Sequence, residues 1–216
     1  MRLIDTHSHL FLEEFSEDLP QVIERARSAG VTHIFMPNID STTIDSMLSV
    51  CNTYNDYCFP MIGLHPTSVN ADYEKELEIV ARELRSFNKY IAIGEVGMDL
   101  YWDKTFLKEQ QIVLDKQINW ALEYDLPVVI HCRDAFGYIY NVLEPYKNTS
   151  LKGVFHSFTG TDDEAARILE FSGFLIGING VVTFKKSRLP EVLTKIPLEK
   201  IVLETDSPYL TPVPNR

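Results

Sequence analysis

Two histidines one residue apart, His7 and His9, end a short apolar run near the start of the chain. Alternate side chains of a strand point to the same face, so both imidazoles are expected on one side. Imidazole pairs of this kind bind divalent metal ions. A lone histidine at a strand end is more often a hydrogen-bonded structural residue, so ligands from elsewhere must decide. Asp5 shares the face one pleat deeper, where we expect it to hold hydrogen bonds instead of metal.

Further polar residues lie at the ends of other apolar runs along the chain. They are His65, Glu95, His131, His156 and Asp206. Mixed imidazole and carboxylate donors suit zinc, manganese, iron or cobalt. Together with the first two histidines, four of these residues make six metal-ligand candidates: His7, His9, Glu95, His131, His156 and Asp206. Six ligands are too many for one catalytic ion and suit two. A carboxylate on a middle strand could reach both ions, so Glu95 is the expected bridge.

The apolar runs recur along the whole chain, and stretches with helical spacing of apolar residues separate them. Eight runs are present, at residues 2–9, 31–38, 59–66, 91–99, 126–133, 152–160, 174–180 and 201–210. Eight repeated βα units predict an α/β fold, a (β/α)8 barrel of TIM type forming a single domain over residues 1–216, with its active site at the C-terminal ends of the strands. A doubly wound open sheet is the competitor, but it would draw ligands from only one or two strands.

The region after the last predicted strand is short. The chain ends ten residues after Asp206, so we expect the barrel to lack most of its final C-terminal helix. One outer face of the barrel would then remain uncovered.

Composition narrows the class of protein and its partners. The 216 residues are 45% hydrophobic and 24% charged, which is ordinary for a globular domain, and no run is long enough to cross a membrane. Three unpatterned cysteines and no signal-peptide pattern predict a reducing, cytoplasmic location. The net charge of −11 disfavours extended binding to duplex DNA. Bound metal ions would neutralise carboxylates gathered around them, so the acidic net charge does not exclude a nuclease that contacts nucleic acid only locally.

Two groups of residues near the predicted strand ends have open roles. The aromatic residues Tyr101, Trp102 and Phe106 follow the fourth run, and they either line the barrel mouth or cover the barrel. A basic cluster within residues 185–188 follows the seventh run. It is either a solvated loop or a rim facing phosphate, since barrels often bind phosphate near their last loops.

Six motifs taken together, in order, resemble those of one family. DTHSHL, GLHP, GEVGMD, PVVIHCRDA, FHSFTG and LETDSPYL are similar to the motifs of the TatD family of metal-dependent deoxyribonucleases, within the amidohydrolase-like superfamily. The resemblance extends from the first predicted strand to the eighth. It implies a distorted TIM barrel with a two-metal site that hydrolyses DNA, often as a 3′-to-5′ exonuclease. In the family, further C-terminal helices follow the proline-rich turn at which this chain ends.

The resemblance also implies a role for each site residue. His7, His9, Glu95 and Asp206 would bind one metal ion, and Glu95, His131 and His156 the second. His65 and Arg133 would face the scissile phosphate. We expect two divalent ions (zinc, manganese or magnesium), a DNA substrate that is single-stranded or offers strand ends, no membrane partner, and a monomer.

The expected reaction is attack of water on phosphorus, with Asp206 accepting the proton and Glu95 joining the two ions. Two alternatives are kept. The first is a metal-dependent hydrolase of an ester or amide, such as D-aminoacyl-tRNA or a small cyclic amide. Members of the superfamily often bridge their metals with a modified lysine, and GEVGMD contains no lysine, which favours the nuclease branch. The second is a non-catalytic metal-binding protein.

Overall fold

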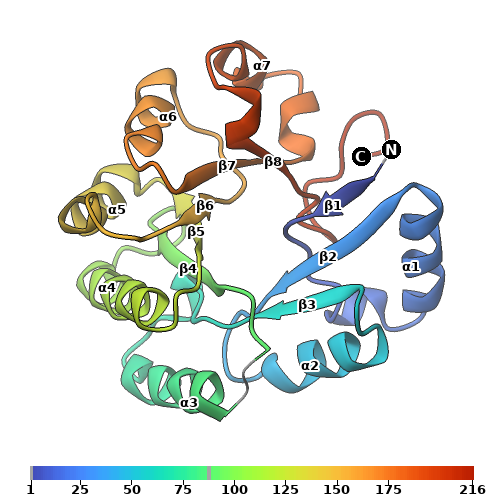
Figure 1. The fold of residues 1–216 in the computed structure, drawn as a ribbon, viewed down its shortest axis with the longest axis horizontal. Helices are drawn as coiled ribbons and strands as arrows, with labels where there is room; N and C mark the ends of the chain where they lie inside the picture. The colour runs from blue at the N-terminus through green and yellow to red at the C-terminus, as the bar shows by residue number, and fades with distance from the viewer. Residues whose placement is uncertain (1, 87–88) are drawn as a thin grey trace.

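The computed structural model describes residues 2–86 and 89–216, and its strands form a ring with helices outside it (Figure 1). Every apolar run predicted to be a strand overlaps one. The strands are β1 (Leu3–Asp5), β2 (Val31–Pro37), β3 (Cys58–Met61), β4 (Ile93–Asp99), β5 (Val128–Arg133), β6 (Gly153–Phe155), β7 (Phe174–Ile178) and β8 (Ile201–Leu203).

The strands are parallel and pair in chain order. Hydrogen bonds join β1, β2 and β3 into one sheet and β4 to β8 into another. Two isolated parallel bridges connect the sheets, Ile62 with Ile93 between β3 and β4, and Ser8 with Ser207 beyond β1 and β8. The strands therefore surround one interior, as expected for a TIM-type barrel, and the open doubly wound alternative is wrong.

The helices cover the outside of this ring (Figure 1). In the described part of the chain they are α1 (Leu19–Ser28), α2 (Ile44–Thr53), α3 (Tyr73–Ser86), α4 (Leu107–Glu123), α5 (Phe136–Leu143), α6 (Asp162–Leu169) and α7 (Leu189–Leu193), with short 3-10 turns between elements. Local sequence sets several boundaries. Thr161 and Glu164 form a reciprocal capping box at the start of α6. Gly30 follows α1 with a φ of 92°, a conformation that glycine adopts without strain.

The main core lies between the strands and their helices. Every residue of β4 is buried, because one face points into the barrel and the other lies under α4. Leu114 and Ile118 of α4 and Ile93 and Met98 of β4 are all 0% exposed. This packing makes β4 a rigid support for Glu95.

Coverage is weaker where β1 meets β8. Ile4 of β1 is 43% exposed and Leu203 of β8 is 55% exposed. The described residues after β8 form no helix, as expected from the short segment that follows Asp206.

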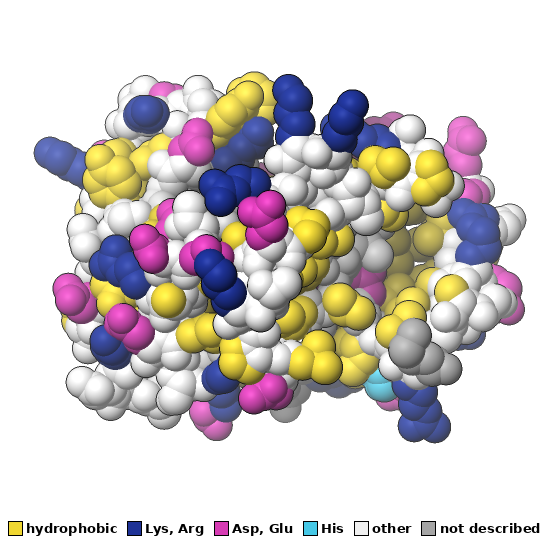
Figure 2. Space-filling view, turned by 90° about the horizontal axis from the view of Figure 1, so that it is seen from above, with side chains coloured by type: hydrophobic (Ala, Val, Ile, Leu, Met, Phe, Trp, Pro, Cys, Tyr) yellow, Lys and Arg dark blue, Asp and Glu magenta, His cyan; other side chains and the backbone are white. Residues whose placement is uncertain are grey.

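The outer surface carries both signs of charge. On the face drawn in Figure 2, lysine and arginine side chains alternate with acidic and apolar ones. On that face, basic side chains do not gather into one continuous track of the kind that follows a duplex backbone. Across the described residues, none of the helices is both long and apolar enough to span a bilayer.

Candidate metal centre

The first part of the site forms where the first strand, β1, lies beside the last strand, β8. His7 and His9 follow β1, and Asp206 follows β8. The Asp206 amide donates to the His7 carbonyl at 2.8 Å, and the His9 amide donates to the Ser207 carbonyl at 2.8 Å. These backbone bonds bring side chains from opposite ends of the sequence together.

Asp5, the last residue of β1, holds this junction together with hydrogen bonds. Its carboxylate accepts the Thr205 amide at 2.9 Å, the Thr205 hydroxyl at 2.7 Å and the His7 amide at 3.3 Å. The expectation that Asp5 is a hydrogen-bonding residue and not a metal ligand agrees with these contacts.

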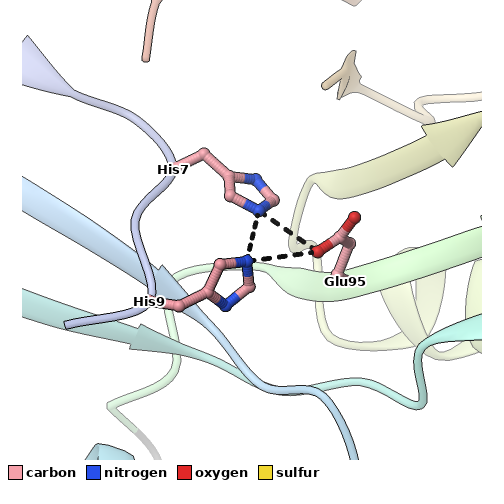
Figure 3. A group of neighbouring side chains, drawn as sticks. All are labelled: His7, His9 and Glu95. Atoms are coloured by element: carbon pink, nitrogen blue, oxygen red, sulfur yellow. Dashed lines mark hydrogen bonds and ion pairs between the residues drawn. The ribbon is translucent and has the colours of Figure 1, made fainter. Parts of the chain in front are cut away.

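His7, His9 and Glu95 direct their donor atoms at one another (Figure 3). The two histidine Nε2 atoms lie 3.2 Å apart, and Glu95 Oε2 lies 3.2 Å from His7 Nε2 and 3.7 Å from His9 Nε2. Asp206 Oδ1 lies 3.7 Å from His7 Nε2 and 3.5 Å from His9 Nε2. Two imidazoles and two carboxylates thus surround a common point, and this donor set fits a divalent transition-metal ion.

The second oxygen of Glu95 faces a different group of imidazoles. Glu95 Oε1 lies 2.9 Å from His131 Nδ1, 3.3 Å from His65 Nε2 and 3.7 Å from His156 Nε2. One carboxylate therefore contacts nitrogen donors on both of its sides. This is the geometry of a carboxylate that could bridge two ions, and the donors present fit two.

Glu95 does not end its strand, so that part of the sequence prediction is wrong. β4 continues to Asp99, and its pairing with β5 shifts register between Ile93 and Val96. Gly97, which pairs with His131, has a φ of 137°. A Cβ there would lie 2.0 Å from the His131 carbonyl oxygen, so a side chain would force β4 away from β5.

Two further side chains position histidines, and the sequence prediction missed their role. Asp99 Oδ2 lies 2.9 Å from His131 Nε2. Glu204 Oε1 lies 3.1 Å from His156 Nδ1. Both acids are buried and stand within predicted strand-end motifs, Asp99 in GEVGMD and Glu204 in LETDSPYL. The available signal was an acidic residue beside a candidate ligand, because ligand histidines usually contact a carboxylate or carbonyl through their other nitrogen.

Helix α4 fixes two strand ends with buried glutamines. Gln110 accepts the Asp99 amide at 3.0 Å and donates to the Asp99 carbonyl at 3.3 Å. Gln117 accepts the Leu64 amide at 2.7 Å and donates to the Leu64 carbonyl at 3.2 Å. The segments that carry Asp99 and His65 are thus held by side chains outside the barrel.

Electrostatics favour charged groups at the centre. Burial alone would raise the pKa of Glu95. The imidazoles of His65, His7 and His156 and a hydrogen bond with His131 outweigh burial, so the pKa of Glu95 lies well below its usual value. Burial also opposes ionisation of Asp206, whose pKa is nevertheless lowered by His9, His156 and His7. The carboxylates are therefore ionised at neutral pH, as metal binding requires.

Arg133 lies on the exposed rim, opposite Asp99 in the pairing of β4 with β5. Its guanidinium carbon lies 3.8 Å from the centre of the Tyr101 ring and 5.3 Å from that of Trp102. Tyr101 and Trp102 are therefore at the barrel mouth, whereas Phe106 packs against the core. The basic side chains Lys186 and Arg188 line a separate cavity of about 460 Å³ between the loops after β6 and β7, away from the candidate ligands.

Comparison with known proteins identifies the family. The sequence profile described as TatD related DNase matches residues 4–216. The chain belongs to the TatD family. The TatD relatives include the uncharacterized metal-dependent hydrolase YabD of Bacillus subtilis, which is 37% identical over 99% of this chain and 83% of its own length. The 3′-5′ ssDNA/RNA exonuclease TatD of Pantoea ananatis is 32% identical over 97% of this chain and 81% of its own length.

Solved structures agree with the TatD assignment. The crystal structure of the TatD homolog YjjV from Escherichia coli superposes with a TM-score of 0.91 at 32% identity, covering 99% of this chain and 82% of that one. A TatD family hydrolase from Entamoeba histolytica superposes with a TM-score of 0.80 at 25% identity, covering 97% and 75% of the two chains. The protein is therefore a metal-dependent hydrolase of the TatD family with a TIM-like barrel.

Proposed function

We propose that the protein is a two-metal phosphodiesterase that removes nucleotides from ends of single-stranded DNA, as a 3′-to-5′ exonuclease. The observation that carries the proposal is the position of Glu95, whose carboxylate oxygens face different histidine nitrogens, Oε2 those of His7 and His9 and Oε1 that of His131. The name of the Pantoea relative supports a nucleic-acid substrate. The net charge of −11 and the mixed charges in Figure 2 favour local binding of a strand end over extended binding to a duplex.

The resemblance to the TatD family supplies the proposed division of residues between the two ions. His7, His9, Glu95 and Asp206 would hold one, and Glu95, His131 and His156 would hold the other. Divalent ions in such a site polarise a phosphoryl oxygen and lower the pKa of water towards neutral. Zinc and manganese suit the histidine-rich donors, and magnesium remains a candidate for turnover.

His65 and His131 differ in what their ring nitrogens can do. His65 Nδ1 accepts the Thr67 amide at 3.2 Å, so the ring proton lies on Nε2, which points towards Glu95. An Nε2–H group donates hydrogen bonds and does not bind metal, which supports His65 as a donor to a phosphate oxygen. His131 Nε2 instead faces the Asp99 carboxylate, which leaves the lone pair of Nδ1 towards the centre.

The protein's own groups then suffice for proton transfer and orientation. Asp206 accepts a proton from the attacking water, since its carboxylate is ionised and faces the centre. Arg133 presents a planar cation that can bind two phosphate oxygens. The protein would act as a cytoplasmic monomer, and its three free cysteines agree with a reducing compartment.

The test is cleavage of a 5′-labelled single-stranded oligonucleotide by purified protein loaded with zinc, manganese or magnesium. We expect products that shorten from the 3′ end and that disappear with Asp206→Asn. Asp45→Asn, an exposed acid on α2, is the matched control and should cleave normally. Hydrolysis of a D-aminoacyl-tRNA or a cyclic amide without cleavage of DNA would instead favour the ester or amide alternative. Metal binding without any hydrolysis would favour a non-catalytic protein.

A further inference from the structure

Two large aromatic side chains stand exposed at the barrel mouth, directly after β4. Trp102 is 73% exposed and Tyr101 is 53% exposed. Their rings meet edge to face, with centroids 4.8 Å apart and planes at 89°. This arrangement leaves a broad face of indole open to solvent. An exposed tryptophan beside a candidate active site indicates a contact surface, because a packing role would bury the ring.

The aromatic pair is tied directly to the candidate metal centre. The Tyr101 amide donates to Asp99 Oδ1 at 3.0 Å, and Asp99 Oδ2 contacts His131 Nε2 at 2.9 Å. One side chain therefore joins the aromatic segment to a candidate ligand. A substrate whose phosphate reached the centre would have its neighbouring groups over these rings.

Arg133 adds a cation to the same surface. Its guanidinium stacks on the Tyr101 ring at 3.8 Å and lies 5.3 Å from the Trp102 ring. Stacking holds the planar cation in place while leaving its edges free for hydrogen bonds. A flat apolar face beside a fixed cation matches one class of partner, a nucleotide, with a base to stack and a phosphate to neutralise. Base stacking on aromatic rings is also insensitive to sequence, which suits an exonuclease.

We propose that Tyr101, Trp102 and Arg133 form a nucleotide platform, on which an unpaired base next to the cleaved phosphodiester stacks on Trp102 while its phosphate contacts Arg133. This proposal rests on the proposed function and specifies how the strand is bound. Bases in a duplex are stacked on their neighbours and cannot occupy the platform. The platform therefore accounts for a preference for single strands without a basic track along the surface.

The test compares two substrates that differ only in their bases. One is a single-stranded oligonucleotide, and the other is the same strand with abasic sites at its 3′ end. We expect Trp102→Ala to raise KM on the normal strand roughly tenfold or more, with little change in kcat, and Trp102→Phe to restore most of the loss. On the abasic strand the three proteins should behave alike. Tyr124→Ala is the control, because Tyr124 is an exposed aromatic residue that precedes β5 at the opposite end of the barrel.

A second measurement separates the platform from the hydrolysis. Metal-loaded wild-type protein is titrated with a cleavage-resistant phosphorothioate strand while tryptophan fluorescence is recorded. The normal strand should quench the fluorescence and the abasic strand should not, and Trp102→Phe should remove the quenching. An equal loss on both substrates, or fluorescence that does not depend on the bases, overturns the platform. Quenching needs no cleavage, so it decides the platform even if the protein proves not to hydrolyse DNA.

Discussion

Replacing Asp99 with asparagine should weaken metal binding without touching a ligand. Asp99 uses both oxygens, one to accept the Tyr101 amide at 3.0 Å and one to contact His131 Nε2 at 2.9 Å. Asparagine has one oxygen and one NH2 group, so it can accept from only one of these donors. If the NH2 group faces His131, the imidazole must accept at Nε2 and carry its proton on Nδ1. His131 Nδ1, which faces Glu95, is then no longer a ligand atom.

The expected size of the effect follows from this exchange. Loss of a carboxylate behind a ligand histidine lowers metal affinity about 10- to 100-fold. That loss corresponds to about 1.4 to 2.7 kcal/mol of binding free energy. An unmet buried donor costs a similar amount, about 1 to 3 kcal/mol, whichever way the amide turns. The second cost lowers the stability of the metal-free and the metal-bound protein alike, so it adds to the loss of folding stability and not to the loss of metal affinity.

The assay is a competition titration of zinc or manganese with a chromophoric chelator, resolving two binding steps in the wild type. Asp99→Asn should weaken one step and leave the other nearly unchanged. The Asp45→Asn variant should bind both ions normally. Unchanged affinity in a folded Asp99→Asn protein would refute the positioning role.

Two further perturbations test the fold around the site. Burial, opposed by hydrogen bonds from Thr205 and His7, raises the pKa of Asp5 from 3.8 to about 6, so the native metal-free protein holds this proton longer than the unfolded chain does. The free energy of unfolding should therefore fall by up to about 3 kcal/mol as pH rises from about 4 to 6, and then level off. Urea unfolding of the wild type and of Asp5→Asn over this pH range measures the difference, and parallel pH profiles of the two proteins would contradict it. Leu114→Ala removes a fully buried side chain between α4 and β4 and should lower the free energy of unfolding by about 2 to 5 kcal/mol. Ile112→Ala, at an exposed position of the same helix, is the control, and an equal loss in this variant would show that packing is not the cause.

The sequence predicted the barrel and its donors because both depend on local patterns. Strand-like runs at a βα spacing fix the order of the strands, and residues that follow parallel strands meet at one end of the barrel. His7 and Asp206 could therefore be placed together from positions far apart in the sequence. The resemblance to the TatD family added the division of the donors between two ions.

The remaining details depend on contacts that no local pattern encodes. Glu95 lies inside β4 because the strand continues to Asp99, and the pairing of β4 with β5 shifts register between Ile93 and Val96. His65 Nδ1 accepts a hydrogen bond from the amide of Thr67 in the turn that follows it. The contact of Asp99 with His131 joins neighbouring strands and is likewise set by the tertiary structure. Such effects need the tertiary structure.

The junction of β1 and β8 has a consequence for how the protein is made. Asp5 and Thr205 are 200 positions apart, and the contacts between them hold His7 beside Asp206. Because Asp206 follows β8, translation supplies it long after His7 and His9. A nascent chain that stops before β8 thus contains most of the candidate ligands but not the carboxylate proposed to accept the proton. The candidate metal centre is consequently complete only after β8 has been translated.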